Sequence, residues 1–290
     1  MFRIGITLAI LLLGTRGAAQ QHEHEHEHPK AAPSKSEAFF GKEELSRQVG
    51  IHEKGCKKGD AQECFNLALA YAQGLAVPKD DARAATFYKK ACDKAFLAAC
   101  NNLGIAYMEG VGVKKDPKQA LSFFEKTCKA EDAKGCFNVG MAHASGFGVA
   151  KDPERAATFF DKACGKGHAD GCFSLGVAHA QGNGAKKDPE RAAALFTKAC
   201  DAGNMTACNT LGVSYLSGTG VKQDKKQAFD LFSKACDAEL PGGCFNLGLS
   251  YRYGNGVAKD PARTKALFEK ACQLQFPPAC EALGASSRAQ

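Results

Sequence analysis

Apolar side chains recur along the chain with the spacing of an α-helix, in units of 36 residues. In one unit, Ala106 and Tyr107 follow Leu103 by three and four positions, and a second stripe contains Ala120 and Phe124. Residues three and four positions apart share one face of a helix. Each unit therefore predicts two amphipathic helices, which together form a helix hairpin.

The boundaries of the two runs support this hairpin. The loop at 110–113 contains two glycines and recurs in later units, and glycine can end a helix in a left-handed conformation. An aspartate precedes each second helix, where its carboxylate can cap free backbone N–H groups: Asp80, Asp116, Asp152, Asp188, Asp224 and Asp260. A lysine lies in the last turn of each second helix, facing the negative end of the helix dipole: Lys90, Lys126, Lys162, Lys198, Lys234 and Lys270. We interpret both columns as structural.

One such hairpin cannot bury its apolar face alone, so the units must stack on one another. The predicted fold is all-α, a right-handed α-solenoid of stacked helix hairpins. Six repeats cover residues 61–276, and an N-terminal capping helix covers residues 37–60. An incomplete C-terminal capping helix and a tail cover residues 277–290.

The first 19 residues have the pattern of a signal peptide, with an early basic residue (Arg3), an apolar run over residues 4–13 and small residues at 17–19. This run is shorter than the roughly 20 residues that a membrane span needs, and no later segment suggests a span. Residues 20–36 are predicted to form a flexible tail rich in histidine and glutamate. We therefore expect an exported protein, periplasmic or secreted.

Fourteen cysteines fit an oxidising compartment if they pair with one another. Partners eight positions apart recur every 36 residues, whereas pairing cysteines 28 apart would strand Cys56 and Cys280. The predicted disulfides join Cys56 with Cys64, Cys92 with Cys100, Cys128 with Cys136, Cys164 with Cys172, Cys200 with Cys208, Cys236 with Cys244, and Cys272 with Cys280. Zinc sites and thioredoxin-like dithiols more often have C-x-x-C spacing, which favours structural bridges.

The histidine-rich tail is a candidate for weak metal binding. His22, His24, His26 and His28 alternate with glutamates and formally satisfy H-E-x-x-H, but that motif needs a rigid helix to place both histidines on one face. Loose capture of a divalent transition metal is the functional interpretation, and a solvated tail is the alternative. No other cofactor is expected.

His143 and His179 are candidate catalytic or ligand-binding residues because they replace the tyrosine found at this position in the other units. Stacked repeats could bring the two imidazoles close together. The simpler interpretation is that both pack as smaller aromatic rings, since no third ligand or nucleophile accompanies them.

The residues after each second cysteine of a pair suggest a binding groove. Solenoids bind along extended concave surfaces, and amides beside aromatic rings can contact an extended peptide. The candidate groove residues are Phe65, Asn66, Asn102, Phe137, Asn138, Phe173, Phe245 and Asn246, and Ser174 and Thr210 continue the polar column. The alternative is that these side chains only cap helices and pack between repeats.

The motifs C-x-N-L-G-x-x-Y, G-x-G-V-x-K-D and A-x-x-F-x-K-A-C, repeated every 36 residues, resemble Sel-one-like repeats, which are related to tetratricopeptide repeats. With paired cysteines and a signal peptide, the chain is similar to the Helicobacter cysteine-rich proteins. The first unit departs from the motif with Ala68 and Ala76 in place of glycine. The resemblance implies penicillin binding with slow β-lactamase activity, although S-x-x-K, S-D-N, K-T-G and G-x-S-x-G motifs are absent.

Two functions follow from these observations. The first is an exported, disulfide-rich scaffold that binds a protein, a peptide or cell-wall material such as peptidoglycan fragments in its concave groove. The alternative, implied by the resemblance only, is a β-lactam-binding protein with slow β-lactamase activity. Without Arg3 and Arg16, 36 basic and 31 acidic residues remain, which leaves a net charge of only +5 and gives no reason to expect a nucleic-acid partner.

Overall fold

The computed structural model describes the backbone of residues 35–287 and the side chains of residues 43–284. The predicted signal peptide and the tail histidines (His22, His24, His26 and His28) lie outside the described residues. The described part of the chain is helical and has no β-strand. None of its helices combines the length and the apolar character that crossing a membrane would require.

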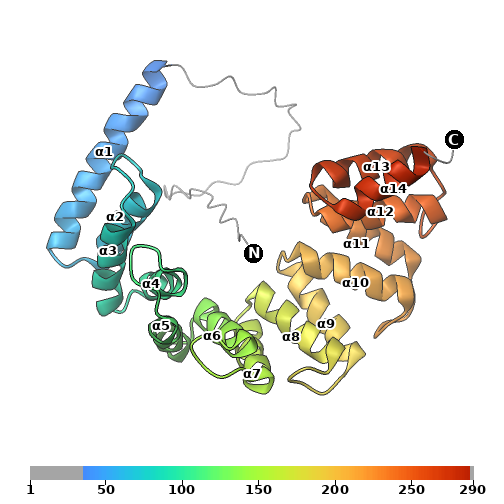
Figure 1. The fold of residues 1–290 in the computed structure, drawn as a ribbon, viewed down its shortest axis with the longest axis horizontal. Coiled ribbons are helices and arrows are strands. Elements are labelled where there is room, and N and C mark those ends of the chain that lie inside the picture. Colours follow the sequence, from blue (N-terminus) through green and yellow to red (C-terminus); the bar gives the residue numbers. More distant parts are fainter. Residues whose placement is uncertain (1–34, 288–290) are drawn as a thin grey trace, which may run out of the picture. The chain divides into compact units, whose positions relative to one another are not determined.

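The helices follow one another as hairpins (Figure 1). Their bounds are α1 Lys35–Lys57, α2 Ala61–Gln73, α3 Asp81–Asp93, α4 Leu97–Glu109, α5 Pro117–Lys129, α6 Ala133–Ser145, α7 Pro153–Gly165, α8 Ala169–Gln181, α9 Pro189–Asp201, α10 Met205–Ser217, α11 Lys225–Asp237, α12 Pro241–Tyr253, α13 Pro261–Gln273 and α14 Pro277–Ser287. The chain divides into two units, residues 1–42 and 43–290, and all the hairpins lie in the second.

Within this second unit, the most extensive contacts join helices that are consecutive in sequence. We call α2, α4, α6, α8, α10 and α12 the first helices, and α3, α5, α7, α9, α11 and α13 the second helices. Packing against sequence neighbours is the defining property of a solenoid. The predicted all-α solenoid of helix hairpins is confirmed.

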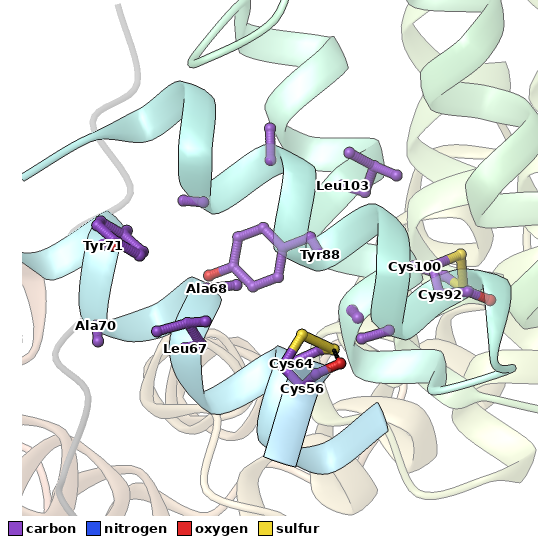
Figure 2. Close-up of a cluster of buried hydrophobic side chains, with 14 of the residues drawn as sticks. Cys56, Cys64, Leu67, Ala68, Ala70, Tyr71, Tyr88, Cys92, Cys100 and Leu103 are labelled. Atoms are coloured by element: carbon purple, nitrogen blue, oxygen red, sulfur yellow. Dashed lines mark hydrogen bonds between the residues drawn. A yellow bond between two sulfur atoms is a disulfide. The ribbon is translucent and has the colours of Figure 1, made fainter. Parts of the chain in front are cut away.

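All seven predicted disulfides are present, and the described residues contain no free cysteine. Each bridge joins the last turn of one helix to the first turn of the next, as Cys92 in α3 and Cys100 in α4 illustrate (Figure 2). The Cα atoms of the partners lie 4.3 to 4.9 Å apart. The bridges therefore link successive repeats, because each one fixes the short turn between two hairpins.

A glycine in five of the six first helices lets an aromatic ring approach the helix backbone. A Cβ atom at Gly104 would lie 2.5 Å from Cε1 of Phe124, which is closer than packing allows. The same pairing recurs as Gly140 with Phe160, Gly176 with Phe196, Gly212 with Phe232, and Gly248 with Phe268. The first repeat instead has Ala68 beside the hydroxyl end of Tyr88 (Figure 2), so both partners change together.

The second glycine of each loop is required by the stacking of repeats. Gly112 has a φ of 71°, and a Cβ atom there would lie 2.0 Å from the carbonyl oxygen of Asp81 in the preceding hairpin. A side chain at this position would both strain the backbone and separate the two repeats. Ala76 occupies the equivalent position in the first repeat, which no complete repeat precedes, and it adopts a φ of 56°.

The aspartate column stabilises helix ends as expected, whereas three of the six lysines bond to a different helix from the one expected. The six aspartates each accept backbone N–H bonds at the start of their own second helix. By contrast, Lys126 Nζ donates to the carbonyl oxygen of Cys92, 3.0 Å away in the last turn of the preceding second helix. Lys234 and Lys270 make the corresponding bonds to Cys200 and Cys236. These lysines therefore link neighbouring repeats.

Candidate functional site

Charge is distributed very unevenly between the two kinds of helix. Each second helix carries four or five Asp, Glu, Lys or Arg residues. Each first helix carries one such residue or none. A helix that reaches solvent ordinarily places charged and polar residues there. The charge-poor first helices are therefore the more suitable surface for a partner.

Aliphatic side chains form a column along these first helices, five residues after the second cysteine of each pair: Leu69, Ile105, Met141, Val177, Val213 and Leu249. Met141 and Val213 are 46% and 45% exposed, and the other four are half-buried. The predicted polar column lies three residues earlier, on the same side of each helix. We call the surface formed by the aliphatic column and this polar column the first-helix face.

The four predicted groove phenylalanines are half-buried, and each packs against a ring in the second helix of its own hairpin. Phe65 packs against Tyr88 and Phe96, with ring centroids 5.9 and 4.9 Å away. Phe137, Phe173 and Phe245 have equivalent neighbours: Phe160 and His168, Phe196, and Phe268 and Phe276. These rings form the base of the first-helix face, and their packing contributes to the stacking of repeats.

The polar column differs between its ends and its middle. Asn66 accepts a hydrogen bond from Gln62, and Asn246 donates to Asn209, which lies in the column of residues next to the cysteines. Asn102 bonds with the hydroxyl of Tyr88; burial raises the pKa of Tyr88, and this hydrogen bond acts in the opposite direction.

In the middle repeats the polar column forms no side-chain hydrogen bond within the part of the chain that the structure describes. Among the described residues, neither Asn138 nor Ser174 has a side-chain hydrogen-bond partner. Their donors and acceptors are therefore available to a ligand in the third and fourth repeats.

A cavity of about 270 Å³ has Ser174 in its lining. Helices α6, α7 and α8 line it, and most of its lining is apolar: Met141, Ala144, Pro153, Ala156, Ala157, Phe160, Phe173, Ser174, Val177, Ala178, Gln181 and Asn183. The lining includes two members of the aliphatic column, Met141 and Val177, and one predicted groove residue, Phe173. The cavity is therefore part of the first-helix face.

Two of the candidate residues do not form a shared site. His143 is 4% exposed and stacks on Phe159, with ring centroids 5.7 Å apart. Its Nδ1 atom is buried without a hydrogen-bond partner. His179 Nδ1 lies 3.0 Å from the carbonyl oxygen of Lys186, so each imidazole contacts its own hairpin. No cluster of three or more potential metal ligands occurs within residues 43–284.

The Sel1 repeat family model matches the chain at residues 64–96, 97–132, 133–168, 169–204, 206–240 and 241–276. These six segments cover most of the sequence and correspond to the six hairpins from α2–α3 to α12–α13. The chain belongs to the Sel1 repeat family. The resemblance inferred from the repeated motifs is thus confirmed, and no curated protein matches the sequence.

Solved structures agree with this assignment. A protective antigen from uropathogenic Escherichia coli strains, described as displaying an SLR fold, is 27% identical, with a TM-score of 0.76 over 82% of this chain and 51% of the antigen. A Sel1 repeat protein from Oxalobacter formigenes is 23% identical, with a TM-score of 0.70 over 81% of this chain and 94% of that protein. Helicobacter pylori cysteine rich protein B is 34% identical over 46% of this chain and 96% of its own, with a TM-score of 0.38. This Sel1 repeat protein therefore spans about half the length of the E. coli antigen.

Three features of this Sel1 repeat protein were not predicted from its sequence. The aliphatic column and the scarcity of charge on the first helices are both visible once the repeats are aligned. The cavity has a weaker signal, because it depends on small residues contributed by three different helices.

Proposed function

We propose that this Sel1 repeat protein is a scaffold that binds an extended peptide or protein segment along its first-helix face. The observation that carries the proposal is the aliphatic column, exposed at Met141 and Val213 and half-buried elsewhere, on helices that are almost without charge. Exposed apolar surface bordered by polar groups is typical of interaction sites in soluble proteins. Solenoids in general present extended surfaces of this kind to their partners.

The polar column supports a peptide over other ligand classes. Amide and hydroxyl groups can both donate to and accept from the backbone of an extended chain, as Asn138 and Ser174 are free to do. Hydrogen bonds from the polar column to the ligand backbone fix the direction in which the ligand lies. The neighbouring aliphatic column supplies the apolar contact area. Cell-wall fragments and β-lactams are the alternative ligands.

We further propose that the protein works in an oxidising compartment after export. Seven disulfides account for every cysteine in the described chain, and bridges of this number persist outside the reducing cytosol. The amino-terminal pattern of residues 1–19 is consistent with such a route. Detection of the processed chain in periplasmic or culture fractions would test this part of the proposal.

The binding proposal can be tested with a displayed library of random peptides selected on the oxidised protein. Introducing charge into the aliphatic column with Met141→Asp/Val213→Asp should weaken the selected peptides about tenfold or more, because the carboxylates lose solvation when the ligand covers them. A matched control, Ala82→Asp/Ala194→Asp, places the same charges at exposed positions of second helices and should leave affinity unchanged. A selection that enriches no peptide, or equal losses in both variants, would overturn the proposal.

A further inference from the structure

The cavity between the third and fourth repeats is the most specific feature of the first-helix face. Helices α6, α7 and α8 line it, and these helices are neighbours in the solenoid (Figure 1). Its volume of about 270 Å³ falls just below the roughly 300–1,000 Å³ of pockets that hold whole drug-sized ligands. A space of this size suits part of a ligand, such as one large side chain.

The preceding junction shows which larger side chains can occupy the space of this cavity. At the preceding junction, between the second and third repeats, Met108, Leu121 and Phe147 pack together in one apolar cluster with Phe124 and Val139. The residues 36 positions later are smaller or polar: Ala144, Ala157 and Asn183. The cavity is lined by these three residues, which are smaller or more polar than the side chains that fill the preceding junction.

Free hydrogen-bonding groups lie next to this cavity. Ser174 belongs to its lining, and Asn138 occupies the same repeat position one unit earlier. Both side chains lack partners within the described chain, whereas the equivalent Asn66, Asn102 and Asn246 are hydrogen-bonded. The unused polar groups and the unfilled apolar space therefore occur in the same two repeats.

The charged residues around the cavity indicate which charge its ligand can carry. On the two first helices that line it, the charged residues are Lys134 and Asp170, both in the first turn. Asp170 already accepts a hydrogen bond from Asn204. A ligand with charged residues beside its apolar anchor would lose solvation against this mostly apolar lining.

We propose that this cavity is an anchoring pocket for one bulky apolar side chain, aliphatic or aromatic, of an extended segment whose neighbouring residues are uncharged. The side chain enters between Ala144 and Ala157, and the backbone on either side is hydrogen-bonded by Asn138 and Ser174. This inference rests on the proposed peptide-binding function and specifies the partner of the same face. The third and fourth repeats thereby determine which segment binds, and the other repeats contribute less selective contacts.

The pocket can be filled with the residues that the protein already uses one repeat earlier. The variant Ala144→Met/Ala157→Leu/Asn183→Phe copies the junction at Met108, Leu121 and Phe147, so it should fold with an unchanged or higher melting temperature. The matched control Ala82→Met/Ala194→Leu adds apolar volume at exposed positions of second helices and leaves the pocket open.

Peptides selected on the unmodified protein from a random displayed library provide the probe. We expect them to share one large apolar residue, and we expect replacement of that residue by alanine to weaken binding by about tenfold or more. The filled variant should lose affinity to a similar extent, and the control variant should keep it. The alanine-substituted peptide should bind the filled variant and the unmodified protein with similar affinity, because it no longer carries the side chain that occupies the pocket.

The outcomes separate this inference from the proposed function. A selection that yields no binding peptide would overturn both. Selected peptides that bind the filled variant as tightly as the unmodified protein would overturn the pocket and leave the binding face in place. Selected peptides that share a charged residue instead of an apolar one would also contradict the pocket.

Discussion

His143 shows how a residue can fit the fold and still leave a polar atom without a partner. Its ring stacks on Phe159, and its backbone carbonyl accepts the Asp152 N–H at 2.8 Å, but its Nδ1 atom is buried and unpaired. At the same position in the last repeat, the Tyr251 hydroxyl accepts a hydrogen bond from Arg263, 2.7 Å away. Arg155 is the equivalent arginine in the repeat of His143.

Replacing His143 with tyrosine should therefore stabilise the protein. The substitution His143→Tyr removes the unpaired nitrogen and brings a hydroxyl within reach of Arg155, which should raise the free energy of unfolding by about 1 kcal/mol in urea titrations. His179→Tyr is the matched control. The Nδ1 of His179 already bonds to the Lys186 carbonyl, so this substitution should increase the free energy of unfolding by less. Equal gains at both positions, or a loss at His143, would show that the unpaired nitrogen has no energetic cost.

At the scale of single elements, α8 has an unusual start. Its N-cap is His168, whose Nδ1 atom accepts the Gly171 N–H at 3.2 Å, where other first helices use Asp60, Asp132 or Asn204. Burial lowers the pKa of His168, and the nearby Asp170 partly opposes that effect. A protonated imidazole could no longer accept the capping hydrogen bond, so the cap depends on the neutral form.

This cap predicts a specific pH dependence. Because the pKa of His168 is lower in the folded state, the unfolded state binds more protons as the pH falls, and stability should decrease below the unfolded pKa of about 6.5. We expect thermal melts between about pH 7.5 and pH 5.5 to show a larger loss of stability in the unmodified protein than in His168→Asn. Asparagine caps α10 at the equivalent position and does not titrate. Parallel pH profiles for the two proteins would contradict the expectation.

The elements were largely predictable, and the contacts between them were not. Hairpins, aspartate caps and disulfides follow from patterns within 36 residues, because each depends on local spacing. The partner of Lys126 and the cavity at Ala144 depend on residues from adjacent repeats, whose distances follow only once the stacking geometry is known. The phenylalanine column was ambiguous for the same reason: at Phe137 the ring contributes to repeat packing and to the base of the first-helix face.

At the scale of the whole solenoid, stability is expected to be distributed over the junctions. Each junction combines a disulfide, close glycine contacts and, in three cases, a lysine bond to the preceding repeat. A bridge with an eight-residue separation is worth about 2.5 kcal/mol in the chain-entropy model. Since neighbours supply nearly all the contacts, loss of one bridge should weaken its own junction far more than a distant one.

Removal of a central bridge tests this expectation. In Cys164→Ala/Cys172→Ala, amide hydrogen exchange should accelerate up to about 50-fold in α7 and α8, which the bridge joins, and remain nearly unchanged in α2 and α13. The matched variant Cys272→Ala/Cys280→Ala should affect α13 and α14 and leave α7 and α8 protected. Uniform acceleration along the chain in both variants would mean that the repeats open only as one cooperative unit.

Local acceleration would mean that the pocket between the third and fourth repeats is held in place by its own junction. A ligand bound in the pocket should then protect that junction from hydrogen exchange.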